Sequence, residues 1–232
     1  MRIRYEDINP TFIKGLVVSL VSAHVLLWSI CYVVSALNGT MEYPNLFLSS
    51  AMQFDPARGI ASILFPIIAI LTGTILLLRS VLLKSRIQTE WQRRLWMMFN
   101  ICSALSVLGM IVVPAIPYAL HKAIHLSAAF TVFICGFSIM FVSTILDRSL
   151  KLPVVAWMKH FRRLLTMLAL AGSVGFGVFF NWIDIISSIS ELVASGCMTA
   201  YICTLAHDSD FFSGAPESKP ESKPDTELLT AV

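Results

Sequence analysis

The chain is organised as long apolar runs separated by short polar connections. Six of the runs are near the ~20 residues that a helix needs to cross ~30 Å of hydrocarbon at 1.5 Å per residue. Periodicity within each run is weak, as expected for helices whose faces meet lipid or another helix. We therefore predict six transmembrane helices, over residues 12–37, 60–83, 95–113, 120–146, 164–182 and 185–206.

Composition agrees with this pattern. The 232 residues are 56% hydrophobic and only 13% charged, whereas a soluble domain is about half apolar and a quarter charged. The expected fold class is an all-α polytopic membrane protein, a six-transmembrane-helix bundle over residues 1–207. Residues 208–232 are predicted to form a disordered cytoplasmic tail, because they offer little apolar surface to bury.

The basic residues predict the orientation. Fifteen of the 17 Lys and Arg residues fall on one side of the predicted spans, and only Arg58 and Lys122 fall on the other. The positive-inside bias assigns the crowded side, with both termini, to the cytoplasm. The net charge of +3 is therefore expected to meet anionic membrane lipids, phosphoinositides among them, and gives no indication of nucleic acid.

A group of polar residues is expected on the lumenal side. His121 and His125 share one face of the fourth helix, while Asp184 lies in the turn before the sixth helix and Glu191 about two turns into it. We expect Glu191 to pair with His125 or Lys122, or to face a wet cavity, because burial of a carboxylate in hydrocarbon is costly. Such a set could hold a metal ion that activates water, or its members could simply satisfy one another. We assign no metal, cofactor or catalytic residue from it.

Two further polar residues lie at membrane depth. His24 is in the middle of the first helix, where a structural hydrogen bond or a ligand contact would account for it. Asn100 lies in the third helix near Ser103 and Ser106, and we expect it to form hydrogen bonds between helices.

The first lumenal loop, residues 38–59, contains apolar residues that a free loop does not need, so we expect it to fold back onto the helix ends. Asn38-Gly39-Thr40 matches the glycosylation pattern. Asn38 lies at the end of the first helix, however, which places it close to the membrane for a modifying enzyme.

The tail carries two short peptide motifs. Asp225, Leu228 and Leu229 match the acidic dileucine signals that sorting adaptors recognise, and the terminal Val232 fits a PDZ ligand, which binds by strand addition. The alternative is a solvated tail without partners.

The first loop also resembles a known superfamily of six-pass proteins. The stretch Leu48-Ser49-Ser50-Ala51-Met52-Gln53-Phe54-Asp55-Pro56 lies before the second helix. It is similar to the Pro-containing loop of the damage-regulated autophagy modulators (DRAM), with Ser50 in place of an Asp and Asp55 before a single Pro56. It is also similar to the loop of the post-GPI-attachment lipid-remodelling factors, through Leu48, Ser49, Ser50, Ala51 and Met52.

The resemblance covers residues 12 to 212 and extends to the TMEM150-type proteins. Asn100, His125 and Glu191 match positions where the superfamily has an Asn, a His and a Glu at the same helices. It implies a role in autophagy and lysosomal regulation, in the organisation of phosphatidylinositol kinases, or in GPI-anchor processing. The resemblance identifies no established catalytic residue in this chain.

These observations favour a non-enzymatic membrane regulator that acts through lipid and protein partners, in lysosomes or late endosomes rather than the Golgi, endoplasmic reticulum or plasma membrane. Small residues on the fifth helix, Ala169, Ser173 and Gly177, serve packing within the bundle or formation of a homo-oligomer. The alternative function is a GPI-anchor lipid-remodelling factor, or a subunit of a lumen-facing lipid-modifying enzyme that uses His121, His125, Asp184 and Glu191.

Overall fold

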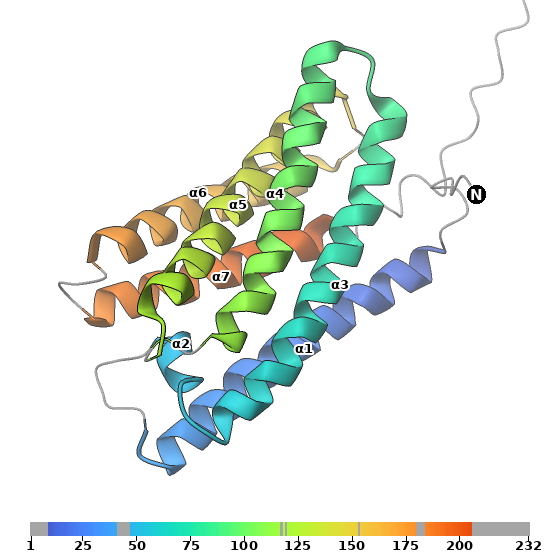
Figure 1. The fold of residues 1–232 in the computed structure, drawn as a ribbon. Helices are drawn as coiled ribbons and strands as arrows, with labels where there is room; N and C mark the ends of the chain where they lie inside the picture. The colour runs from blue at the N-terminus through green and yellow to red at the C-terminus, as the bar shows by residue number, and fades with distance from the viewer. Residues whose placement is uncertain are drawn as a thin grey trace, which may run out of the picture.

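The computed structural model describes residues 9–40, 47–116, 118, 120–152, 154–179 and 184–205. Six long helices and one short helix account for most of this part of the chain, which contains no strand (Figure 1). The helices are α1 (Pro10–Leu37), α2 (Leu48–Ala51), α3 (Ala57–Arg86), α4 (Glu90–Ala115), α5 (Lys122–Ser149), α6 (Ala156–Phe179) and α7 (Asp184–Leu205).

The six long helices are long and apolar enough to cross a membrane, which confirms the predicted fold class. Several extend beyond their apolar runs. For example, α4 begins at Glu90, before the predicted 95–113, because Gln92 folds back and accepts a hydrogen bond from the backbone N–H of Thr89 at 3.1 Å. The predicted tail, with Asp225, Leu228, Leu229 and Val232, lies outside the described residues.

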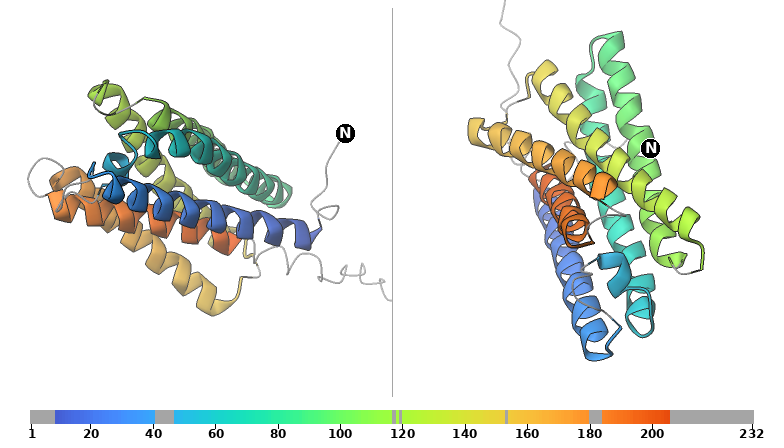
Figure 2. Two further views of the ribbon diagram at one scale, coloured as in Figure 1. Left: turned by 90° about the horizontal axis from the view of Figure 1, so that it is seen from below. Right: turned by 90° about the vertical axis from the view of Figure 1, so that its left-hand side faces the viewer.

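The helices follow one another around the bundle, with α3 between α1 and α4, and α5 between α4 and α6 (Figure 1). α7 packs against α6, and it runs beside α1 (Figure 2). We call the end that carries α2 and the α4–α5 and α6–α7 connections the α2 end. The opposite end carries the α3–α4 and α5–α6 connections and is called the basic end.

Buried side chains form two separate core clusters. One combines residues of α5, α6 and α7, among them Phe133, Phe176 and Met198. The other combines residues of α1, α2 and α3, among them Leu27 and Met52. The bundle thus has two apolar cores.

The first loop folds back onto the helices as expected, in its described part. Phe47, Leu48, Ala51 and Met52 are buried. The hydroxyl of Ser35 on α1 donates a hydrogen bond of 2.5 Å to the carbonyl of Ala51, which fixes α2 against the end of α1.

A buried charged cluster joins four helices at the basic end. Asp147 on α5 accepts hydrogen bonds from Arg79 on α3 and from Arg162 on α6, the latter at 2.8 Å. Arg162 also donates to the hydroxyl and the carbonyl of Thr204 on α7, at 2.9 and 2.7 Å. The sequence pattern placed Arg79 and Arg162 among cations that face lipid headgroups. That interpretation is wrong, because both are at most 3% exposed and face Asp147.

Candidate functional site

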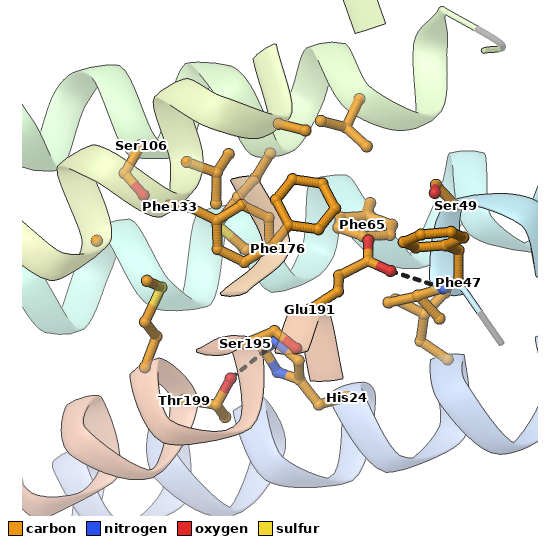
Figure 3. A pocket seen from close by; sticks show the side chains of 18 of the residues that line it. His24, Phe47, Ser49, Phe65, Ser106, Phe133, Phe176, Glu191, Ser195 and Thr199 are labelled. Atoms are coloured by element: carbon orange, nitrogen blue, oxygen red, sulfur yellow. Dashed lines mark hydrogen bonds between the residues drawn. The ribbon is translucent and has the colours of Figure 1, made fainter. Parts of the chain in front are cut away.

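An interior cavity of about 420 Å³ lies between the two core clusters and is here called the α2-end cavity. All seven helices contribute side chains to its wall, most of them apolar. Figure 3 shows Phe133 and Phe176 on one side of it and Phe47 and Phe65 near Glu191.

Glu191 is the buried acidic residue of this cavity. Its side chain reaches from α7 to α2, where Oε2 accepts a hydrogen bond of 3.0 Å from the backbone N–H of Leu48 (Figure 3). The first N–H groups of a helix have no partner within the helix, and the residue before α2, Phe47, supplies no side-chain cap. Glu191 therefore caps α2 from a distant part of the sequence.

The predicted pairing of Glu191 with His125 or Lys122 is wrong. Nδ1 of His125 lies 2.8 Å from the carbonyl oxygen of Ile116. Because a carbonyl oxygen only accepts hydrogen bonds, Nδ1 carries the hydrogen. The Lys122 ammonium lies 5.4 Å from the ring centroid of Tyr118. Both residues thus stabilise the α4–α5 connection, while Glu191 borders the largely apolar α2-end cavity.

His24 connects two helices at the side of the cavity. Its Nδ1 lies 3.1 Å from the carbonyl oxygen of Leu20, one turn earlier on α1. Its Nε2 lies 3.2 Å from the hydroxyl oxygen of Thr199 on α7 (Figure 3). With Nδ1 as donor, the neutral ring leaves Nε2 to accept from Thr199. His24 therefore has a structural bond and also lines the cavity.

Hydroxyl groups supply the remaining polarity of the wall. Ser49 and Ser50 on α2, Ser106 on α4 and Ser195 on α7 line the cavity. Thr72 on α3 also lines it, and its hydroxyl is buried with no hydrogen-bond partner in the described part of the chain.

The four residues of the predicted lumenal cluster do not meet at one point. His121 is exposed at the start of α5 and does not line the cavity. Asp184 is exposed at the start of α7 and contributes to the rim, whereas His125 and Glu191 are buried. Among the described residues no group of three His, Cys, Asp or Glu side chains is arranged to hold a metal ion.

The other predicted residues lie away from the cavity. Asn100 accepts a hydrogen bond of 2.6 Å from Ser80 on α3, so it links helices as expected. Asn38 is exposed at the C-terminal cap of α1. Asp55 forms an exposed ion pair with Arg58 at 3.8 Å, and Pro56 precedes α3.

Two buried polar residues, Asp147 and Thr72, were not predicted from the sequence. Asp147 directly follows the predicted span 120–146, so it resembled an ordinary flanking charge, although it is the single carboxylate of a strongly basic connection. Thr72 is one of many hydroxyl residues in the apolar runs, and no sequence signal distinguishes it.

No curated protein and no solved structure matches the sequence of the chain at a significant level. A family model, described as Frag1/DRAM/Sfk1/Cwh43P N-terminal domain, matches residues 16–210, which contain all the described long helices except the start of α1. The chain is therefore a multi-pass membrane protein that belongs to the Frag1/DRAM/Sfk1/Cwh43P family.

Proposed function

We propose that the chain is a non-enzymatic membrane regulator of the DRAM type, which acts in autophagy or lysosomal or phosphoinositide-linked membrane regulation. We propose that an amphiphilic lipid binds in the α2-end cavity and controls the activity of this regulator. The observation that carries this proposal is the cavity itself, apolar along most of its wall with the carboxyl group of Glu191 near α2.

The size of the cavity supports a small ligand. Its volume of about 420 Å³ lies within the range of about 300 to 1,000 Å³ for pockets that bind small molecules. Apolar walls suit a hydrocarbon chain or ring system. The hydroxyl groups of Ser49 and Ser50 offer hydrogen bonds to a hydroxyl or carbonyl group.

Photo-crosslinking tests whether lipid enters the cavity. Cells that express the tagged protein would be fed a diazirine-bearing fatty acid, which they incorporate into their lipids, and a diazirine-bearing sterol. We expect Ala129→Phe, which fills the cavity from α5, to lose most of the crosslinking that the wild type shows. The control is Ala104→Phe, which adds the same ring to the exposed face of α4. Equal crosslinking of both variants would argue against occupancy of the cavity.

Turnover tests whether the protein is an enzyme. The purified protein would be incubated with phospholipids and GPI-anchored substrates, and the products analysed by mass spectrometry. We expect no conversion. Conversion that Glu191→Gln abolishes while the abundance of the protein is unchanged would replace the proposal with a lipid-modifying activity.

Localisation tests the cellular role. We expect the tagged protein in lysosomes or late endosomes, and we expect Leu228→Ala/Leu229→Ala to shift it to the cell surface by removing the sorting signal. Golgi residence that is indifferent to these substitutions would support GPI-anchor remodelling instead.

A further inference from the structure

A second cavity, of about 360 Å³, lies at the basic end between the last turns of α5 and the first turns of α6. Positive charge dominates its wall. Two of the charged residues are buried and belong to the cluster described above, and the other four are exposed. The charged residues are Asp147, Arg148, Lys151, Lys159, Arg162 and Arg163, and we call this cavity the basic pocket.

Among the residues that the structure describes, no nearby carboxylate balances the positive charge of the basic pocket. Asp147 is the only acidic residue in its wall, and it is engaged by Arg79 and Arg162. No Asp or Glu occurs in the sequence between Asp147 and Asp184. In the described part of the chain, no ion pair involves the four exposed cations.

The other connection at this end has a different arrangement. On α4, Arg93 and Arg94 lie 2.9 and 3.8 Å from carboxylate oxygens of Glu90. Lys84 lies over the ring of Trp96, 5.4 Å from its centroid. The positive-inside tendency explains basic residues at both connections. It does not explain why basic residues of the α3–α4 connection contact Glu90 or Trp96, whereas those of the α5–α6 connection surround a cavity.

The described part of the α5–α6 connection has its backbone held by hydrogen bonds. The N–H of Leu152 donates to the carbonyl of Asp147 at 3.1 Å, and that of Leu150 donates to Leu146 at 2.8 Å. The side chains of Leu152 and Val154 are buried in the core. The cations are therefore held on an ordered scaffold, which lowers the entropic cost of gathering them around an anion.

An apolar stripe begins where the basic pocket ends. Met167, Leu170 and Val174 follow Arg163 at intervals of four, seven and eleven residues, which places them on the same side of α6. All three are exposed on the outer surface of the bundle. A molecule bound by Arg163 and Lys159 would thus have hydrocarbon-compatible surface next to its charged group.

We propose that the basic pocket binds the headgroup of a membrane lipid that carries a phosphate monoester in addition to its phosphodiester. A phosphate monoester carries about −1.5 to −2 charges and three strong acceptor oxygens, which suits several Lys and Arg donors. Basic pockets between membrane helices are a known way to bind such headgroups. The stripe on α6 receives the acyl chains, so the site takes a lipid rather than a soluble phosphate.

Binding of short-chain lipids to the full-length purified protein tests the proposal. The probe is dioctanoyl phosphatidylinositol 4-phosphate, compared with dioctanoyl phosphatidylinositol, which lacks the monoester, and with glycerophosphoinositol 4-phosphate, which lacks the acyl chains. We expect the first to bind at least tenfold more tightly than either of the others. The variant Lys159→Gln/Arg163→Gln should raise its Kd about 30-fold, as expected for two cations near a headgroup.

The matched control is Arg93→Gln/Arg94→Gln, which removes two exposed cations at the same end of the bundle. It should change the Kd less than twofold. An equal loss in both variants, or no loss in either, would overturn the proposal, because the binding would then reflect general surface charge. Equal binding of the chain-free headgroup would overturn the assignment to a lipid.

The outcome is independent of lipid binding in the α2-end cavity, and it bears on the proposed function only through the phosphoinositide-linked role. Ala129→Phe alters the α2-end cavity at the other end of the bundle and should leave binding to the basic pocket unchanged. Thermal unfolding confirms that each variant is folded. The side chains replaced in the two Gln variants, at positions 159 and 163 and at positions 93 and 94, are exposed, so we expect unchanged unfolding temperatures for both.

Discussion

At the scale of single residues, a few polar groups determine which helix ends meet. Glu191 and Leu48 are 143 positions apart, yet their hydrogen bond fixes α2 beneath the end of α7. A short helix of four residues has little stability of its own, because helix formation has a costly nucleus. The carboxyl group of Glu191 thus helps to maintain the conformation of the first loop.

Replacement of Glu191 tests this interpretation. Glu191→Gln retains an oxygen acceptor and should leave the thermal stability nearly unchanged. Glu191→Leu leaves the N–H of Leu48 buried without a partner, which should destabilise the protein by about 1 to 3 kcal/mol. Hydrogen exchange at residues 47–52 and thermal unfolding in detergent measure the effect. Equal behaviour of the two variants would show that the hydrogen bond is not needed.

Replacement of Asp147 should lower the stability of the protein more than replacement of Glu191. Asp147→Asn removes the charge that compensates two buried guanidinium groups, and loss of one member of a buried ionic cluster costs about 3 to 5 kcal/mol. Thermal unfolding and expression level measure this loss. The exposed pair of Asp55 and Arg58 supplies the control, because Asp55→Asn should have no measurable effect. Similar unfolding temperatures for both variants would contradict the prediction.

At the scale of helices, close approach between α6 and α7 depends on glycine. A Cβ atom at Gly172 would lie 2.8 Å from the carbonyl oxygen of Ser190 and 2.9 Å from the backbone nitrogen of Ala194. Both are backbone atoms, so relief requires the helices to move apart. Gly172 therefore contributes to packing within the bundle, whereas Gly177 is exposed and has no such close contact.

A pair of Gly→Ala substitutions isolates this packing effect. Alanine favours a helix over glycine by about 1 kcal/mol at either position. At Gly15 on α1 no atom lies within 4 Å of the added methyl group, so Gly15→Ala should be neutral or stabilising. Gly172→Ala should instead lower the unfolding temperature by several degrees. If the two variants unfold alike, α6 and α7 are less tightly packed than described.

The helices were predictable from the sequence because a segment that crosses lipid must be a long apolar run. An apolar run of this length has few alternatives to a membrane span. The site was only partly predictable. His24, His125 and Glu191 stand out because polar groups are rare in such runs, but their partners do not. The carbonyl of Ile116 and the N–H of Leu48 are backbone groups, which every residue has, so no pattern of residue types identifies them.

At the scale of the whole molecule, the distribution of charge predicts how the bundle sits in the membrane. The basic end carries the α3–α4 and α5–α6 connections with most of the cations, and the α2 end carries Arg58 and Lys122. We therefore expect the basic end, together with both termini, to face the cytoplasm.

Epitope tags test this orientation. After selective permeabilisation of the plasma membrane, antibodies should reach a tag at either terminus but not a tag inserted between residues 40 and 47. A lower apparent mass of Asn38→Gln than of the wild type on a denaturing gel would show that Asn38 is glycosylated, which places the α2 end on the lumenal side. Labelling of the inserted tag under selective permeabilisation would reverse the orientation.

The buried charged cluster at the basic end also has a consequence for biosynthesis. Arg79 precedes Asp147 by 68 residues, so the ribosome makes α3 well before it makes the carboxylate that α3 needs. At about 5 to 20 residues per second, this interval lasts roughly 3 to 14 s. During that time the guanidinium must be held by water, headgroups or an insertion chaperone. A nascent chain that ends before α5 would keep an arginine without its carboxylate at the membrane boundary, which is a feature that quality control can detect.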